Sequence, residues 1–362
     1  MPLPPEPITE ERVDVVVIGA GIGGLHAARL LHQQDRTVSV LERRDRIGGR
    51  LHTVESAGTP VDLGATWFWP QERAVNKVVA EHGLRVHPQH LGGDAIYHDR
   101  PHTKRIEGNP LDVPSGRFTD GAQALAEAEA ALLPEGVIRL EQSATGIELL
   151  ADAVRVTTTL GAVVAKHVVV ALPPALATTD LAFTPPLDAM VASVAAATPV
   201  WMGTTTKVVV RFAEPFWRRH GLSGSGISHL GPIRELHDMS GPDGESAALF
   251  GFAPQRPEGP VTTAEVLAQF AELFPGHPEP LAVELADWST QRATSAPETL
   301  PLGDYATYGH RAFQTPSYDG RLHWASTETA PDNPGHIDGA LLAARRAVAA
   351  ILEPSESERT HP

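Results

Sequence analysis

Apolar runs rich in valine and isoleucine alternate with helical repeats along the chain. Residues 15–18 form the first continuous apolar run, residues 25–31 follow with helical spacing, and residues 37–41 form a second β-branched run. Continuous apolar strands separated by helices are typical of a parallel sheet that is covered on both faces. The opening of the chain therefore predicts a strand, a helix and a second strand of an α/β fold.

The same pattern predicts elements along the remaining chain. The apolar run at residues 163–172 ends at a pair of prolines, which cannot donate to a sheet ladder. Residues 87–117 are rich in proline, glycine and histidine and predict short strands and loops. Further strands are predicted at residues 137–140, 153–159, 204–212, 247–253 and 320–326, and helices at residues 71–83, 120–133, 263–273 and 339–352.

Composition narrows the classes of function. The 362 residues include no cysteine, which excludes disulfides, thiolate metal sites and thiol nucleophiles. The net charge of −15 argues against nucleic acid and anionic membranes as partners, and the 17 histidines lack metal-ligand spacing, so no metal is expected. No apolar run is long enough to span a membrane, and the first residues do not resemble a signal peptide. We therefore expect a cytoplasmic protein, with a homodimer as one option for its oligomeric state.

The turn after the first strand carries a dinucleotide-binding pattern. Gly19, Gly21 and Gly24 stand at the spacing that allows a tight turn, a close approach of backbone to a pyrophosphate, and packing of helix on strand. Gly23 lies in the same turn, and the following helix directs its free N–H groups at the phosphates. Glu42 ends the second strand, where a ribose-binding carboxylate is expected; the alternative is a solvated acid at a strand end.

The chain continues in a way that a nicotinamide-binding domain does not require. Residues 43–50 (RRDRIGGR) and residues 61–67 (VDLGATW) resemble the double-glycine extension of the FAD-binding amine oxidase superfamily. In that family the glycines let the chain run against the pyrophosphate and flavin, and an arginine neutralises phosphate charge. Arg50 is the candidate for this arginine.

Further segments are similar to the flavin monoamine oxidase and polyamine oxidase family, in the same order along the chain. They are residues 169–174 (VVALPP), residues 207–217 ending in EPFW, Trp288, residues 326–330 (STETA) and residues 335–340 (GHIDGA). The resemblance covers most of the chain and implies non-covalent FAD, a small-molecule amine as substrate and O2 as oxidant. The implied cofactor-binding residues are Gly19, Gly21, Gly23, Gly24, Glu42, Arg43, Gly49, Arg50, Gly64, Ala65, Thr66, Trp67, Ala144, Trp288, Glu328 and Ile337.

Lys207 is the sharpest catalytic candidate. In the family a strand lysine reaches the flavin N5 through a water, and Lys207 stands among β-branched residues where a charge is costly unless it is paired or hydrated. The alternative is an edge-strand lysine that faces solvent. Because EPFW follows at the distance found in the family, we favour the catalytic reading.

The substrate side departs from the family pattern. The family holds the amine between two aromatic side chains; Tyr305 aligns with one, whereas His336 stands in place of the other. Asp304 occupies the position of the cysteine that bonds FAD in some members, which implies non-covalent FAD. The helical section that usually roofs the pocket is missing, so the mouth should be open. We expect Trp67, Phe68 and Trp69 to line it with Arg234, the alternative being that the aromatic residues belong to the core.

These observations predict a two-domain flavoprotein. The expected discontinuous Rossmann-like FAD domain comprises residues 8–86, 118–196 and 291–354, the smaller mixed-sheet substrate domain comprises residues 87–117 and 197–290, and residues 1–7 and 355–362 are expected to be disordered. The predicted reaction is hydride transfer from an amine-bearing carbon to flavin N5, with O2 reduced to H2O2 and the imine hydrolysed. A desaturase or amino-acid oxidase of the same fold, in which Arg234 holds a carboxylate, and a flavin-binding protein without activity stay open as alternatives.

Overall fold

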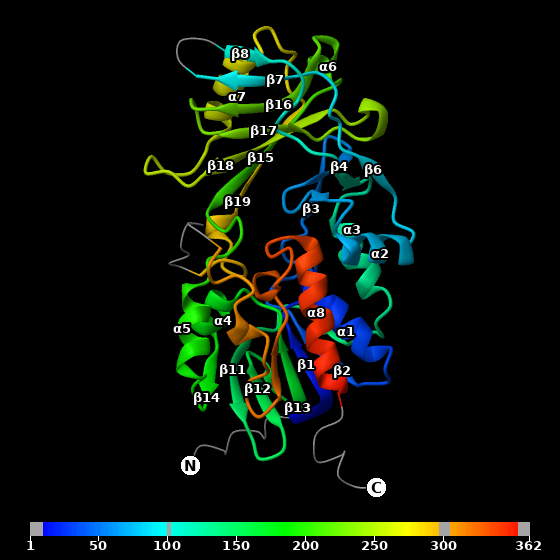
Figure 1. Cartoon of the computed structure of the whole chain (residues 1–362), viewed down its shortest axis with the longest axis vertical. Helices are drawn as coiled ribbons and strands as arrows, with labels where there is room; N and C mark the ends of the chain where they lie inside the picture. Colours follow the sequence, from blue (N-terminus) through cyan, green and yellow to red (C-terminus); the bar gives the residue numbers. More distant parts are fainter. Residues whose placement is uncertain (1–9, 100–102, 297–304, 354–362) are drawn as a thin grey trace, which may run out of the picture. The chain divides into compact units, whose positions relative to one another are not determined.

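The computed structural model describes residues 10–99, 103–296 and 305–353 (Figure 1). Asp304 and the expected disordered segments, residues 1–7 and 355–362, lie outside the described residues. The chain divides into two compact units. Unit 1 comprises Met1–Gly49, Ala126–Trp201 and Leu302–Pro362, and unit 2 comprises Arg50–Leu125 and Met202–Pro301.

The two units differ from the predicted functional domains at several boundaries. Residues 50–86, 118–125 and 291–301, which we assigned to the FAD domain, lie in unit 2, and residues 197–201 lie in unit 1. The two units are the compact parts of the chain, whereas the predicted domains are defined by the molecule that each should bind. The division into a cofactor domain and a substrate domain therefore stays a prediction.

Unit 1 is built on one eight-stranded sheet. Its strands are β1 (Glu10–Ile18), β2 (Val38–Leu41), β10 (Ile138–Arg139), β11 (Ala144–Leu149), β12 (Val154–Thr158), β13 (Gly161–Val170), β14 (Ala182–Thr184) and β20 (Leu322–Trp324). Their order is β10-β2-β1-β13-β12-β11-β14, with β20 paired to β13. β1 runs parallel to both β2 and β13. The predicted α/β fold with a Rossmann-like arrangement is confirmed.

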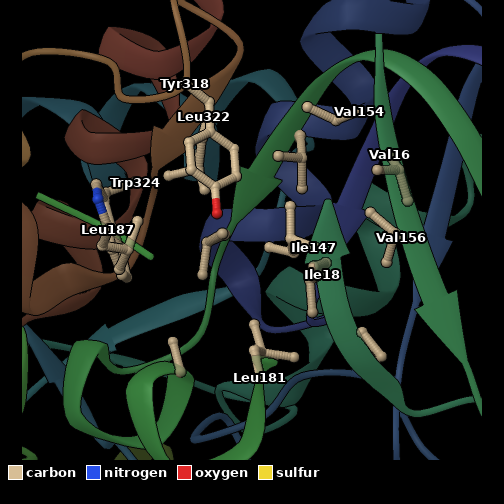
Figure 2. Packing of buried hydrophobic residues seen from close by; sticks show 14 of the residues in the cluster. Val16, Ile18, Ile147, Val154, Val156, Leu181, Leu187, Tyr318, Leu322 and Trp324 are labelled. Atoms are coloured by element: carbon tan, nitrogen blue, oxygen red, sulfur yellow. The ribbon is translucent and has the colours of Figure 1, made fainter. Parts of the chain in front are cut away.

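Helices cover the sheet of unit 1. They are α1 (Ile22–His32), α4 (Pro174–Asp180), α5 (Ala189–Ala197) and α8 (Ile337–Leu352), with the short helices η3 (Arg311–Phe313) and η4 (Thr327–Thr329); α3 (Gln123–Ala130) contains the division between the units. α1 and α8 lie side by side although they come from opposite ends of the chain (Figure 1). The core between the sheet and α4 and α5 includes Ile18, Leu181 and Trp324 (Figure 2).

Unit 2 contains a seven-stranded sheet and two smaller sheets. The large sheet has the order β19-β15-β18-β17-β16-β7-β8, and a two-stranded and a three-stranded sheet accompany it. The strands are β3 (Thr53–Ser56), β4 (Thr59–Asp62), β5 (Trp67–Phe68), β6 (Val86–Pro88), β7 (Asp94–His98), β8 (Thr103–Ile106), β9 (Gly116–Phe118), β15 (Thr205–Arg211), β16 (Leu222–Ser228), β17 (Glu235–Asp238), β18 (Ala248–Pro254) and β19 (Ala282–Asp287); the helices are α2 (Arg73–Glu81), α6 (Phe216–Arg219), α7 (Thr263–Leu273), η1 (Pro242–Gly244) and η2 (Trp288–Thr290).

Successive side chains of β15 point to opposite faces of the large sheet and pack into two separate hydrophobic clusters. Val208 and Val210 pack with Phe270 of α7 on one face of the sheet. Val209 packs with Phe250 on the other face. Because side chains along a strand alternate between faces, Lys207 shares the face of Val209. A lysine is thereby placed on a buried layer of the sheet.

Candidate functional site

The turn between β1 and α1 packs backbone directly against backbone. Gly19 has a φ of 103°, and a Cβ at Gly24 would lie 1.9 Å from the carbonyl oxygen of Gly19. A Cβ at Gly21 would meet no atom within 4 Å, and no side chain caps the N-terminus of α1. The first N–H groups of α1 thus have no side-chain cap, and the positive end of the helix dipole there favours negative charge.

Glu42 holds this turn from the end of β2. Its Oε2 accepts a hydrogen bond of 2.8 Å from the N–H of Ala20, and its Oε1 accepts one of 2.9 Å from the N–H of Arg44. The residue is buried. The alternative of a solvated acid at a strand end is therefore wrong. Each carboxylate oxygen keeps a further lone pair that could accept from a ribose hydroxyl.

The double-glycine segment lies against the same turn. The N–H of Gly48 donates to the carbonyl of Ala20 at 2.8 Å, and a Cβ at Gly49 would lie 3.2 Å from the Cα of Gly21. Arg46, which we did not single out from the sequence, donates to the carbonyl of Gly49 at 3.0 Å. Arg43, a predicted cofactor residue, forms an ion pair of 2.8 Å with Asp180, and its role toward the cofactor stays a prediction.

The start of α8 approaches α1 through small residues. A Cβ at Gly23 in α1 would lie 3.3 Å from the carbonyl oxygen of Ala340 in α8 and 2.5 Å from that of Ala325, which follows β20. Ile337 is the first residue of α8 and is buried, as is Glu328 in η4. Ala144, the predicted adenine contact, is the first residue of β11. The predicted cofactor residues of unit 1 thus include three segments, at residues 19–24, 48–49 and 325–340, that meet around α1.

Tyr305 and His336 belong to one aromatic cluster. Both rings pack against Trp201, which we did not predict, with centroid separations of 5.8 Å for Tyr305 and 6.1 Å for His336. Tyr308 lies beneath them, 6.5 Å from the Trp201 ring. The backbone N–H of Trp201 donates to the Glu328 carboxylate at 3.3 Å. Tyr305 itself is 54% exposed.

Lys207 is the buried charge of unit 2. It is 2% exposed, and its strand lies between β18 and β19. The alternative of a solvent-facing lysine on an edge strand is therefore wrong. Its Nζ donates to the carbonyl of Gly64 at 2.7 Å and to the Thr66 hydroxyl, and lies 4.4 Å from the centroid of the Phe250 ring.

Burial sets the protonation of Lys207. Loss of hydration lowers the pKa of this lysine to about 7, the negative charge of Asp62 opposes the shift, and the positive charge of Arg117 adds to it. Burial in turn raises the pKa of Asp62, although Lys207 and the Thr53 hydroxyl lower it. A lysine with a pKa near neutrality can exchange a proton at physiological pH.

Gly64 and its neighbours shape the surroundings of Lys207. A Cβ at Gly64 would lie 1.9 Å from the carbonyl oxygen of Arg50, which accepts a hydrogen bond of 3.0 Å from Ala65. The indole N–H of Trp288 donates to the carbonyl of Leu63 at 2.9 Å, so this buried residue also fixes the segment. The predicted residues Arg50, Lys207 and Trp288 therefore all contact residues 63–66.

The three aromatic residues expected at the pocket mouth do not all point to the same side of the chain. Trp67 packs against Phe250 at a centroid distance of 5.0 Å, and Trp69 lies 6.3 Å from Trp67. Phe68 is buried against Phe118, so the expectation that it lines the mouth is wrong; successive strand residues point to opposite faces. The predicted substrate residue Arg234 is exposed.

A histidine that we did not predict lies behind Trp67. His237 packs edge-on to the Trp67 ring at 4.9 Å, and its Nδ1 lies 2.7 Å from Asp112 while its Nε2 lies 3.0 Å from Glu235. Burial lowers the pKa of His237, but the hydrogen bonds to Asp112 and Glu235 outweigh it and raise the pKa. No periodic signal in the sequence connects Asp112 with His237.

The described part of the chain contains neither a metal-binding cluster nor a membrane-spanning helix. Histidine and acidic side chains form no cluster there that could hold a metal ion. Among the described helices, none has the length and hydropathy needed to cross a membrane.

Comparison with known proteins identifies the family. The model of flavin-containing amine oxidoreductases matches residues 114–352, which is more than half of the chain, and that of NAD(P)-binding Rossmann-like domains matches residues 17–82. The chain belongs to the flavin-containing amine oxidoreductases. It is thus an oxidoreductase of the amine-oxidase type, and the family implies a flavin cofactor and small-molecule amines as substrates.

Individual relatives agree with this membership. AofH of Mycobacterium tuberculosis, which is named as a flavin-containing monoamine oxidase, is 27% identical over 94% of this chain and 96% of its own. Flavin-containing amine oxidase B of the dog, Canis lupus familiaris, is 26% identical over 94% of this chain and 86% of its own. A putrescine oxidase structure with bound putrescine has a TM-score of 0.83 at 20% identity, covering 96% and 100% of the two chains, and so supports the fold.

The depressed pKa of Lys207 predicts how the stability of this amine oxidoreductase depends on pH. Between pH 7 and 10.5 the unfolded chain binds a proton at Lys207 that the folded chain has released. The free energy of unfolding of the wild type should therefore rise with pH in this window relative to Lys207→Met, by at most about 1.4 kcal/mol per pH unit. Denaturant unfolding of the apoprotein at several pH values measures the difference.

Lys77→Met is the matched control, because the side chain of Lys77 is 65% exposed on α2. Its stability should follow the wild type across the same pH range. Parallel curves for Lys207→Met and wild type would show that the lysine titrates alike in the folded and unfolded chains.

Proposed function

We propose that the protein is an FAD-dependent oxidase of small amines. The amine-bearing carbon is oxidised to an imine, which water hydrolyses to a carbonyl compound and ammonia, while O2 is reduced to H2O2. The observation that carries this proposal is Lys207, a lysine buried in a sheet with a pKa of about 7, in a chain of the amine-oxidase type. Structural support alone would not favour a lysine over an apolar residue at this position.

The residues of unit 1 fit a flavin dinucleotide. The uncapped N-terminus of α1 and the open space beside Gly21 suit a diphosphate. Glu42 would hold the adenosine ribose while it also fixes the N–H of Ala20. The N-terminus of α8 at Ile337 would stabilise negative charge on the flavin pyrimidine. The predicted contacts of Arg43, Ala144 and Glu328 also belong to this proposal.

When bound, the flavin would accept a hydride from the substrate carbon and pass the electrons to O2. The protein supplies orientation and proton control. Lys207 would hold a water through its Nζ, whose position the Gly64 carbonyl and Thr66 hydroxyl fix. Tyr305 and His336 would flank the substrate amine, and Trp67, Trp69 and Arg234 would contact the remainder of the substrate.

We propose that FAD is held without a covalent bond, because the chain has no cysteine. Denaturation of the purified holoprotein should release the flavin into the supernatant, where its absorbance is measured after centrifugation. Flavin that stays with the precipitated polypeptide would point to a bond through another side chain, such as a histidine.

Glu42→Ala should weaken FAD binding by about 1 to 3 kcal/mol, the effect of losing a charged hydrogen-bonding partner. The loss includes the bond to the Ala20 N–H, which fixes the phosphate turn. Calorimetric titration of the apoprotein with FAD measures the change.

Glu148→Ala is the control for this variant, since Glu148 pairs with Arg155 on the surface of the same sheet. FAD should bind to it as to the wild type. An unchanged FAD affinity in Glu42→Ala would remove Glu42 from the cofactor site.

With a primary amine, the proposed reaction requires one carbonyl product, one ammonia and one H2O2 for each O2 consumed. Lys207→Met should keep FAD and slow the reoxidation of photoreduced flavin more than its reduction by the amine, because its proposed water serves the oxidative step. Stopped-flow absorbance separates the two half-reactions.

Product analysis distinguishes the alternatives. A desaturase would oxidise its substrate without releasing ammonia, and an amino-acid oxidase would require a carboxylate on the substrate. Lys207→Met with both half-reactions at wild-type rates would return the lysine to a structural role.

A further inference from the structure

The aromatic cluster of unit 1 contains two rings for which the family resemblance predicted no role, the buried Tyr308 and the partly exposed Trp201. We propose that Trp201 forms the second aromatic wall of the amine site and supplies the contact to the substrate cation that His336 does not. This inference rests on the proposed function, because it assigns a specificity-determining residue to the same site.

Trp201 differs from a residue of the hydrophobic core. Its side chain is partly exposed, and it belongs to none of the buried core clusters found among the described residues. Its ring contacts are with Tyr305, which is 54% exposed, with the partly exposed His336, and with the buried Tyr308. The cluster thus has a buried base and three rings that reach the surface of unit 1.

The backbone makes room for the indole in the loop before α8. Gly335 has a φ of 86°, and a Cβ there would lie 2.6 Å from Cδ2 of Trp201. The backbone N–H of Trp201 donates to the buried Glu328 carboxylate at 3.3 Å. The main chain of Trp201 is therefore tied to η4, while its indole packs on the loop before α8.

The chemistry of the three rings differs in a way that favours this role. An indole face attracts a cation more strongly than the other aromatic side chains do, whereas an imidazole repels one whenever it is protonated. With His336 in place of an aromatic wall, the adjacent Trp201 is the residue that can offer a π face beside Tyr305. An ammonium group at this cluster would contact Trp201 and Tyr305.

The test uses choline and its uncharged isostere 3,3-dimethylbutan-1-ol, whose binding to the holoprotein is followed by the flavin difference spectrum. The wild type should prefer choline. Trp201→Leu, which keeps an apolar side chain but removes the π face, should reduce that preference about tenfold, whereas Trp201→Phe should change it less than about threefold. Phe183→Leu, a partly buried aromatic residue that packs against the core of the same unit, is the matched control and should match the wild type.

A double variant separates recognition from packing. His336→Tyr should restore part of the preference lost in Trp201→Leu, because it places a second aromatic wall beside the same cation. Thermal unfolding and FAD content are measured for every variant. Equal losses for choline and the isostere, equal effects of Trp201→Leu and Trp201→Phe, or a wild type without preference would each overturn the proposal.

The same proteins distinguish this inference from the proposed function. Butylamine and other primary amines are mixed with each holoprotein in the absence of O2. A wild type that prefers choline but is reduced by no amine would contradict amine oxidation and leave the role of Trp201 standing. If amines reduce the wild-type flavin but Trp201→Leu keeps the choline preference, amine oxidation would stand and the role of Trp201 would be contradicted.

Discussion

The close packing of backbone on backbone at the turn between β1 and α1 is the constraint on which unit 1 depends. Gly24 meets the Gly19 carbonyl and Gly23 meets the Ala325 carbonyl, at distances that no side chain would permit. Gly49 lies less closely against Gly21, where a Cβ would be 3.2 Å from the Gly21 Cα. The glycines therefore let distant segments meet through their main chains beside the N-terminus of α1.

A second constraint is the burial of the Lys207 ammonium in unit 2. Desolvation of a charge is costly, and the Gly64 carbonyl, the Thr66 hydroxyl, the Phe250 ring and the charge of Asp62 offset part of it. Gly64 lies so close to the Arg50 carbonyl that a Cβ would not fit, as at Gly23 and Gly24 of unit 1. Residues 61–67, which resemble the family motif, thus also supply the hydrogen-bond acceptors of Lys207.

The sequence predicted those features that local pattern determines. The glycine spacing and the position of Glu42 follow from a strand-turn-helix unit, and the burial of Lys207 follows from the β-branched residues on either side. The interactions of Trp201, His237 and Arg46 could not be predicted, because each depends on where a distant segment or a carbonyl lies in the folded chain. Trp201 meets Tyr305 and His336 only after β13, α4 and α5 have placed it. The short helices α4 and α5 were missed for a related reason, since their stability comes from packing on the sheet and not from a strong local repeat.

The central claim is that an amine reduces the flavin held by this protein. It is tested most directly by titrating the holoprotein with a panel of primary and secondary amines in the absence of O2 and following the flavin absorbance. The account predicts that at least one amine bleaches the flavin completely, with one equivalent consumed for each flavin. If no amine bleaches a flavin that dithionite reduces readily, the protein binds flavin without oxidising amines, and the account is wrong.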